Sequence, residues 1–127
     1  MNRNIDFTLQ KFTEILDSLL KSGYSFQSLE DFIKNPSERA VILRHDVDSS
    51  PVNSLQTARL ENARGIKGTY YFRIVKQSNN TRDIKAIADL GHDIGYNSQA
   101  SPLAHGVAEM AIISFQQNLA YFIHFST

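Results

Sequence analysis

The fold of this chain is decided by residues 39–75, which read "RAVILRHDVDSSPVNSLQTARLENARGIKGTYYFRIV". The apolar run at 41–43 does not alternate with polar residues, which is typical of a strand covered on both faces. After it, Pro51 fits the first position of a helix and Gly65 is a natural helix end. The β-branched and aromatic residues at 67–75 predict a second strand. The stretch therefore predicts a strand–helix–strand unit.

The flanking segments continue this alternation of helices and strands. Apolar residues recur at helical spacing over 7–20, and Ser28 begins a capping-box pattern for a second, short helix. Beyond the central unit, residues 81–91 predict a helix that ends at a glycine, and residues 92–97 predict a strand. The last apolar segment, 107–125, predicts a long final helix.

The predicted order is two helices followed by three strands, each with a helix after it. Such alternation predicts an α/β fold with parallel strands and right-handed crossovers. The 127 residues suit one domain, with the N-terminal helices in 1–37 and a βαβαβα unit in 38–127. Ligands of parallel sheets bind at the carboxyl ends of the strands, and polar loops follow those ends here. A receiver domain of similar length is disfavoured, because such a domain would open with a strand.

The composition excludes several classes of protein. The chain has 13 basic and 13 acidic residues and no cysteine, so we expect no nucleic-acid-binding face, no disulfide and no thiolate metal site. No apolar run approaches the roughly 20 residues of a membrane span. The start, "MNRNIDFTLQ", lacks the apolar core of a signal peptide. The sequence thus predicts a cytoplasmic protein.

Asp46 and Asp48 lie two positions apart at the end of the first predicted strand, with His45 beside them. Alternation along a strand would put both carboxylates on one side, where they repel each other. A divalent metal would relieve the repulsion, with one aspartate as its ligand and the other as a base for its water. Alternatively, Asp48 caps the following helix and Asp46 pairs with Arg44 or Arg73. The residues alone leave both interpretations open.

Two motifs in this order resemble those of the polysaccharide deacetylase family, the NodB-like carbohydrate esterases. They are "HDVD" at 45–48, within the central unit, and "IADLGHDIGYN" at 87–97. The resemblance covers residues 40–122 and is closest to the branch whose first motif is His-Asp-Val-Asp. It implies the N-terminal half of a distorted (β/α) barrel. It also implies the hydrolytic removal of acetyl groups from sugars with a divalent metal, usually zinc.

The resemblance also implies roles for individual residues. Asp46 would be the catalytic base and Asp48 a metal ligand. Arg44, His45 and Arg73 are candidate supporting residues beside them. The expected cofactor is zinc or another divalent metal, and the expected ligand is a carbohydrate.

The second motif departs from the family pattern after "GHDIG". Asn97 and Ser101 stand where the family has two histidine ligands, and asparagine is a poor zinc ligand. His105 is a candidate replacement in the same loop. His92 precedes a strand and His124 lies on the predicted last helix, so neither is expected to be a ligand. The departure predicts weakened or lost metal binding and hydrolysis. The alternative is a non-catalytic module that binds a carbohydrate or a partner.

Half of a barrel would leave open sheet edges, which proteins usually cover. The predicted last helix carries a cluster of apolar residues near its end: Tyr121, Phe122, Ile123 and Phe125. This cluster is either ordinary core or a contact surface. A homodimer through an exposed edge or through this helix is therefore one expected outcome.

Overall fold

The computed structural model describes residues 3–6, 8–47, 51–73, 81–97 and 107–126. The helices are α1 (Leu9–Lys21), α2 (Leu29–Lys34), α3 (Pro51–Ala63) and α4 (Thr81–Asp89). The strands are β1 (Arg3–Asp6), β2 (Ser25–Phe26), β3 (Arg39–Val47), β4 (Thr69–Arg73), β5 (Asp93–Asn97), β6 (Val107–Phe115) and β7 (Asn118–Ser126).

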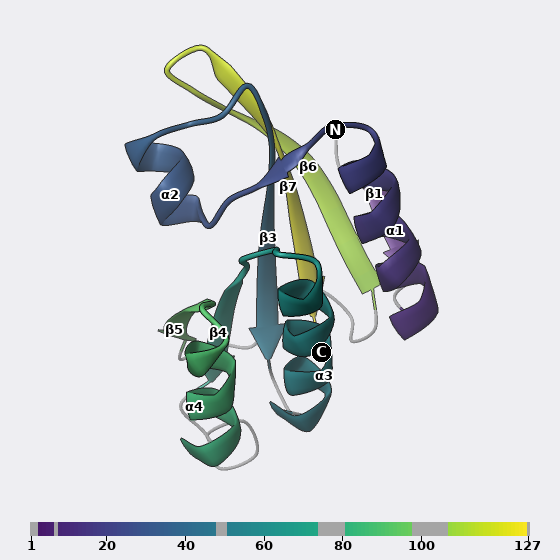
Figure 1. Ribbon diagram of the computed structural model, residues 1–127, viewed down its shortest axis with the longest axis vertical. Helices are drawn as coiled ribbons and strands as arrows, with labels where there is room; N and C mark the ends of the chain where they lie inside the picture. The colour runs from purple at the N-terminus through teal and green to yellow at the C-terminus, as the bar shows by residue number, and fades with distance from the viewer. Residues whose placement is uncertain (1–2, 7, 48–50, 74–80, 98–106, 127) are drawn as a thin grey trace.

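The described strands form one mixed sheet in the order β1-β6-β7-β3-β4-β5, with β2 added beside β3 (Figure 1). β3 is parallel to β2, β4 and β7, and β4 is parallel to β5, whereas β6 is antiparallel to β1 and β7. α3 connects β3 to β4 and α4 connects β4 to β5. The predicted mixed α/β fold with parallel strands is confirmed at this level.

The residues that the sequence marks as helix caps and helix ends have the backbone geometry expected of them. The side chain of Ser28 caps α2 by accepting a hydrogen bond from the backbone N–H of Asp31 at 3.1 Å. α3 begins at Pro51, and Gly65 follows its end with a φ of 70°, which a residue with a side chain adopts only at a cost. These short-range patterns determine where the helices begin and end.

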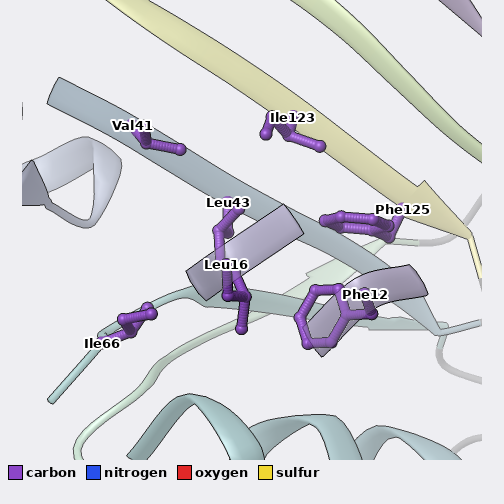
Figure 2. Packing of buried hydrophobic residues seen from close by; sticks show 7 residues of the cluster. All are labelled: Phe12, Leu16, Val41, Leu43, Ile66, Ile123 and Phe125. Carbon is purple, nitrogen blue, oxygen red and sulfur yellow. The ribbon is translucent and has the colours of Figure 1, made fainter. Parts of the chain in front are cut away.

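The sheet has two faces that are covered differently. α1, α3 and α4 pack on one, the helix face, where α1 contributes Phe12 and Leu16 to a core with β3 and β7 (Figure 2). The full cluster is Phe12, Leu16, Val41, Leu43, Ile66, Ile123 and Phe125. The opposite face carries Ala40, Ile42, Arg44 and Asp46 of β3, and α2 covers one end of it through Phe32. We call this second face the open face.

The prediction of a long final helix at 107–125 is wrong, because this segment is the β6–β7 hairpin. Its β-branched and aromatic residues suit strands, although their spacing also matches a helix. The turn residues Gln116 and Gln117 have φ values of 50° and 68°. Two-residue hairpin turns with positive φ favour Asn-Gly, and Gln-Gln carries no such signal. The unit in 38–127 therefore ends in a hairpin instead of a helix.

This correction changes the interpretation of the apolar cluster near the end of the chain. Ile123 and Phe125 are buried in the core, while Tyr121 and Phe122 are partly exposed. The predicted dimer contact through a final helix is wrong, because this segment is not a helix, and a homodimer through an exposed sheet edge stays a prediction.

The two short strands β1 and β2 were not predicted, because runs of 4 and 2 residues are too short to show periodicity. None of the helices in the described ranges is long and apolar enough to cross a membrane.

Candidate functional site

The carboxyl ends of the parallel strands β7, β3, β4 and β5 meet at one edge of the sheet. In register, Asp46 of β3 lies beside Tyr71 of β4, and Arg73 at the end of β4 lies beside Asn97 at the end of β5. The fold therefore places three predicted site positions, 46, 73 and 97, on neighbouring strands at this edge. Asp48, Ser101 and His105 lie outside the described residues.

Asp46 forms the centre of a cluster on the open face. The Nε of Arg44 donates to its Oδ1 at 3.0 Å, and the Nε2 of His124 lies 2.5 Å from its Oδ2. Burial of Asp46 raises the pKa of its carboxyl, but the hydrogen bonds and positive charges of His124 and Arg44 outweigh burial and hold that pKa below its usual range. Asp46 is thus an ionised carboxylate with both oxygens engaged, and its predicted pairing with Arg44 is confirmed.

His124 is the member of the cluster that sequence reasoning missed. It lies in β7, beside Arg44 in register, and its other neighbour in register is Glu109 of β6. The predicted helix at 107–125 concealed this contact, because His124 and Asp46 are 78 positions apart and meet only when β7 pairs with β3. The alternation of Tyr121, Ile123 and Phe125 is the signal that could have predicted a strand with His124 on its opposite face.

His45 lies on the other face of the sheet from Asp46, although the two are adjacent in the sequence. Its side chain is fully buried, with Nε2 2.6 Å from Oε2 of Glu61 in α3. Its ring stacks on Tyr70 at 4.2 Å and on Phe125 at 5.1 Å between centroids. His45 therefore supports the core under α3, and it does not contact Asp46.

Glu61 also connects α3 to β4. The hydroxyl of Tyr70 donates to Oε1 of Glu61 at 2.9 Å. Burial and the negative charge of Glu61 raise the pKa of Tyr70 well above its usual range, so the phenol stays protonated. This buried network binds a helix to two strands and contributes no group to the open face.

His92 is held between two backbone groups. Its Nδ1 accepts a hydrogen bond from the N–H of Gly68 at 3.0 Å, and its Nε2 donates to the carbonyl of Ala58 at 2.9 Å. This arrangement uses both ring nitrogens of a neutral imidazole. The expectation that His92 is not a metal ligand agrees with this placement.

The described residues do not by themselves provide a metal site. No group of three His, Asp or Glu side chains within the described ranges is placed to hold an ion. At the two positions where the resemblance to the deacetylase family leads us to expect histidine ligands, the sequence has Asn97 and Ser101. Zinc in catalytic sites prefers nitrogen, sulfur and carboxylate ligands, so this pair of residues does not fit it.

Comparisons of the chain with models of protein families, with curated proteins and with solved structures found no match. The fold and the site define the chain as a mixed α/β protein with an Arg44–Asp46–His124 cluster at the carboxyl edge of its parallel strands.

Proposed function

We propose that this chain is a polysaccharide-deacetylase-like protein whose hydrolytic activity is weakened or lost. It would be related to the metal-dependent hydrolases that remove acetyl groups from sugars. The observation that carries the proposal is the position of Asp46, on the open face near the carboxyl end of β3. That end of a parallel strand is where α/β sheets place their chemistry.

The state of Asp46 supports weakened activity. A general base works best when its pKa lies near the working pH, whereas Arg44 and His124 hold the pKa of Asp46 below its usual range. Each carboxylate oxygen also has a partner, Arg44 on Oδ1 and His124 on Oδ2, and protonation of Asp46 would weaken these interactions. The side chain of His124 is 15% exposed and that of Asp46 is 4% exposed, so little solvent reaches the carboxylate.

The metal positions support the same conclusion. Zinc, where bound, would supply an activated water. In this chain Asp48 is the family ligand that remains, and Asn97 and Ser101 replace the two histidines. We therefore expect weak zinc binding, or none, in the protein as it is.

Zinc titration by calorimetry and acetate release from an N-acetylglucosamine oligomer test the proposal. The wild-type chain should bind less than one equivalent of zinc and release little acetate. The Asn97→His/Ser101→His variant should bind one equivalent, because it restores the three protein ligands of a catalytic zinc. Adding Asp48→Ala to that variant should abolish the gained binding.

Asn97→Ala/Ser101→Ala is the matched control, since it changes the same positions without adding ligands. Stoichiometric zinc and acetate release by the wild-type chain would show that the activity is intact. A histidine variant that binds no better than the alanine control would contradict the alignment with the deacetylase family. In the wild-type background, Asp48→Ala should leave the thermal stability nearly unchanged.

A non-catalytic binding module is the second candidate, and one depression in the surface favours it. The depression measures about 470 Å³ and lies between α2 and the first residues of β4 and β5. Its lining includes Glu30, Lys34, Thr69, Tyr71 and Asp93, a mixture of aromatic and polar groups that suits a sugar. Binding of the same oligomer, with amide NMR shifts at 69 and 93 and without acetate release, would favour this candidate.

A further inference from the structure

The aromatic ring of Tyr71 connects the two sequence motifs across the open face. On one side, the guanidinium carbon of Arg44 lies 4.2 Å from the centroid of the Tyr71 ring. On the other side, the ring lies against Gly95 of the "GHDIG" motif. A Cβ atom added at Gly95 would be only 2.5 Å from Cε1 and 2.6 Å from Cδ1 of Tyr71. The ring therefore occupies space that a side chain at position 95 would fill.

The sheet register explains why these groups meet. Tyr71 lies between Asp46 of β3 and Gly95 of β5, so the three positions share the open face. Arg44 is two residues before Asp46 and is the diagonal neighbour of Tyr71, a distance that long side chains span. Because Gly95 of β5 has no side chain, there is room for the ring of Tyr71 of β4. That ring in turn lies against the guanidinium of Arg44 of β3.

The contact with the Tyr71 ring restricts the side chain of Arg44, which would otherwise be free to leave Asp46. Its side chain is 32% exposed, and only its Nε atom bonds to Oδ1 of Asp46. A long side chain loses considerable rotamer freedom when it is held in place. A planar guanidinium stacks on an aromatic face, which restricts it without using its N–H groups.

We propose that Gly95 and Tyr71 are positioning residues that hold Arg44 against Asp46, so that the second motif orients the carboxylate of the first. The inference rests on the proposed function only for the role of Asp46 as a base. The chain of contacts from Gly95 through Tyr71 and Arg44 to Asp46 is a property of the fold and can be tested without any hydrolysis.

The pKa of Asp46, measured by carboxyl ¹³C NMR during a pH titration, is the readout. Its described charged neighbours are Arg44 on β3 and His124 on β7, with Glu109 of β6 beside His124. Tyr71→Leu should raise this pKa toward the ordinary aspartate value, because Arg44 loses the ring. Tyr71→Phe keeps the ring and should leave the pKa unchanged. Arg44→Gln is the positive control and should raise it.

Gly95→Ala tests the second half of the inference. The added methyl must displace the ring, so the pKa of Asp46 should rise as it does in Tyr71→Leu. In the double variant Gly95→Ala/Tyr71→Leu no ring remains to be displaced, and the pKa should equal that of Tyr71→Leu alone. If Gly95→Ala alone does not fold, the double variant should fold, because the clash is removed.

Four outcomes would overturn the inference. An unchanged pKa in Tyr71→Leu would mean that Arg44 is held by other contacts. An equal rise in Tyr71→Phe and Tyr71→Leu would assign the effect to the hydroxyl instead of the ring. A full additional effect of Gly95→Ala in the Tyr71→Leu background, or a double variant that does not fold, would mean that Gly95 acts by another route. Failure of zinc binding or acetate release affects none of these measurements.

Discussion

The carboxylate of Glu61 lies 2.6 Å from Nε2 of His45, and both side chains are fully buried. The same carboxylate accepts the hydroxyl of Tyr70 at 2.9 Å, so one residue of α3 satisfies polar groups on β3 and β4. Glu61→Leu would leave both groups buried without this acceptor. We expect the free energy of unfolding in urea at neutral pH to fall by about 3–5 kcal/mol.

Asn62 provides the control, because it is the next residue of α3 and its side chain is exposed. Asn62→Ala should change the free energy of unfolding by no more than about 0.5 kcal/mol. A Glu61→Leu variant as stable as this control would contradict a structural role for the buried pair.

Because the pKa of Asp46 is lowered in the folded protein, we expect the free energy of unfolding to depend on pH in the acid range. Its folded-state pKa lies below the unfolded value of about 3.9, so its contribution is complete above that value and is lost as the pH falls through the folded-state pKa. Asp46→Asn lacks this contribution at every pH. We therefore expect the difference in unfolding free energy between wild type and Asp46→Asn to shrink as the pH falls below about 4. A difference that stays constant in urea denaturation across that range would contradict the prediction.

Because the pKa of Tyr70 is raised in the folded protein, we expect stability to fall as the pH rises in the alkaline range. A group whose folded-state pKa is raised contributes stability that is complete below its unfolded value, about 10 for tyrosine, and is lost as the pH rises toward the folded-state value. Wild type should lose stability above about pH 10, and Tyr70→Phe should lose less over the same interval. Urea denaturation on both sides of this pH, with tyrosinate absorbance recorded in parallel, measures the effect. Equal losses in the two proteins would exclude Tyr70 as the cause.

A substitution in the turn of the β6–β7 hairpin should stabilise the protein, and this tests whether the segment is a hairpin. Gln116 and Gln117 both have positive φ, a backbone conformation that Asn-Gly adopts more readily. The substitution Gln116→Asn/Gln117→Gly should raise the free energy of unfolding by about 1 kcal/mol, because it relieves the cost of left-handed backbone in the turn. Thermal and urea denaturation measure the change.

Gln116→Ala/Gln117→Ala is the matched control for the turn. Alanine favours a helix but, like glutamine, adopts positive φ only at a cost, so this variant should gain no stability over wild type. If 107–125 were a helix, the two results would be reversed, with Ala-Ala stabilising and Asn-Gly destabilising. The pair of variants therefore distinguishes the hairpin from the helix that the sequence predicts.

The two halves of the chain differ in how far local patterns predict their structure. The helix that begins at Pro51, the capped helix after Ser28 and the strand at 39–47 all form where caps, glycines and apolar runs place them. The final segment, 107–125, does not form the predicted element. Its apolar spacing fits the period of a helix as well as that of a strand, and its turn lacks the Asn-Gly pair that marks a hairpin. Pairing with β3 selects the strand, since β7 buries Ile123 and Phe125 against α1 and β3.

The sequence by itself determined the helix ends, the central strand–helix–strand unit and the position of Asp46 near a strand end. Those features depend on neighbours within a few residues, and short-range caps, turns and apolar periods specify them. Only the tertiary structure decided which groups surround Asp46. His124 reaches it through the pairing of β7 with β3, and His45, adjacent in the chain, faces the opposite side of the sheet. Contacts between distant strands are chosen by the packing of the whole core, and no local pattern encodes them.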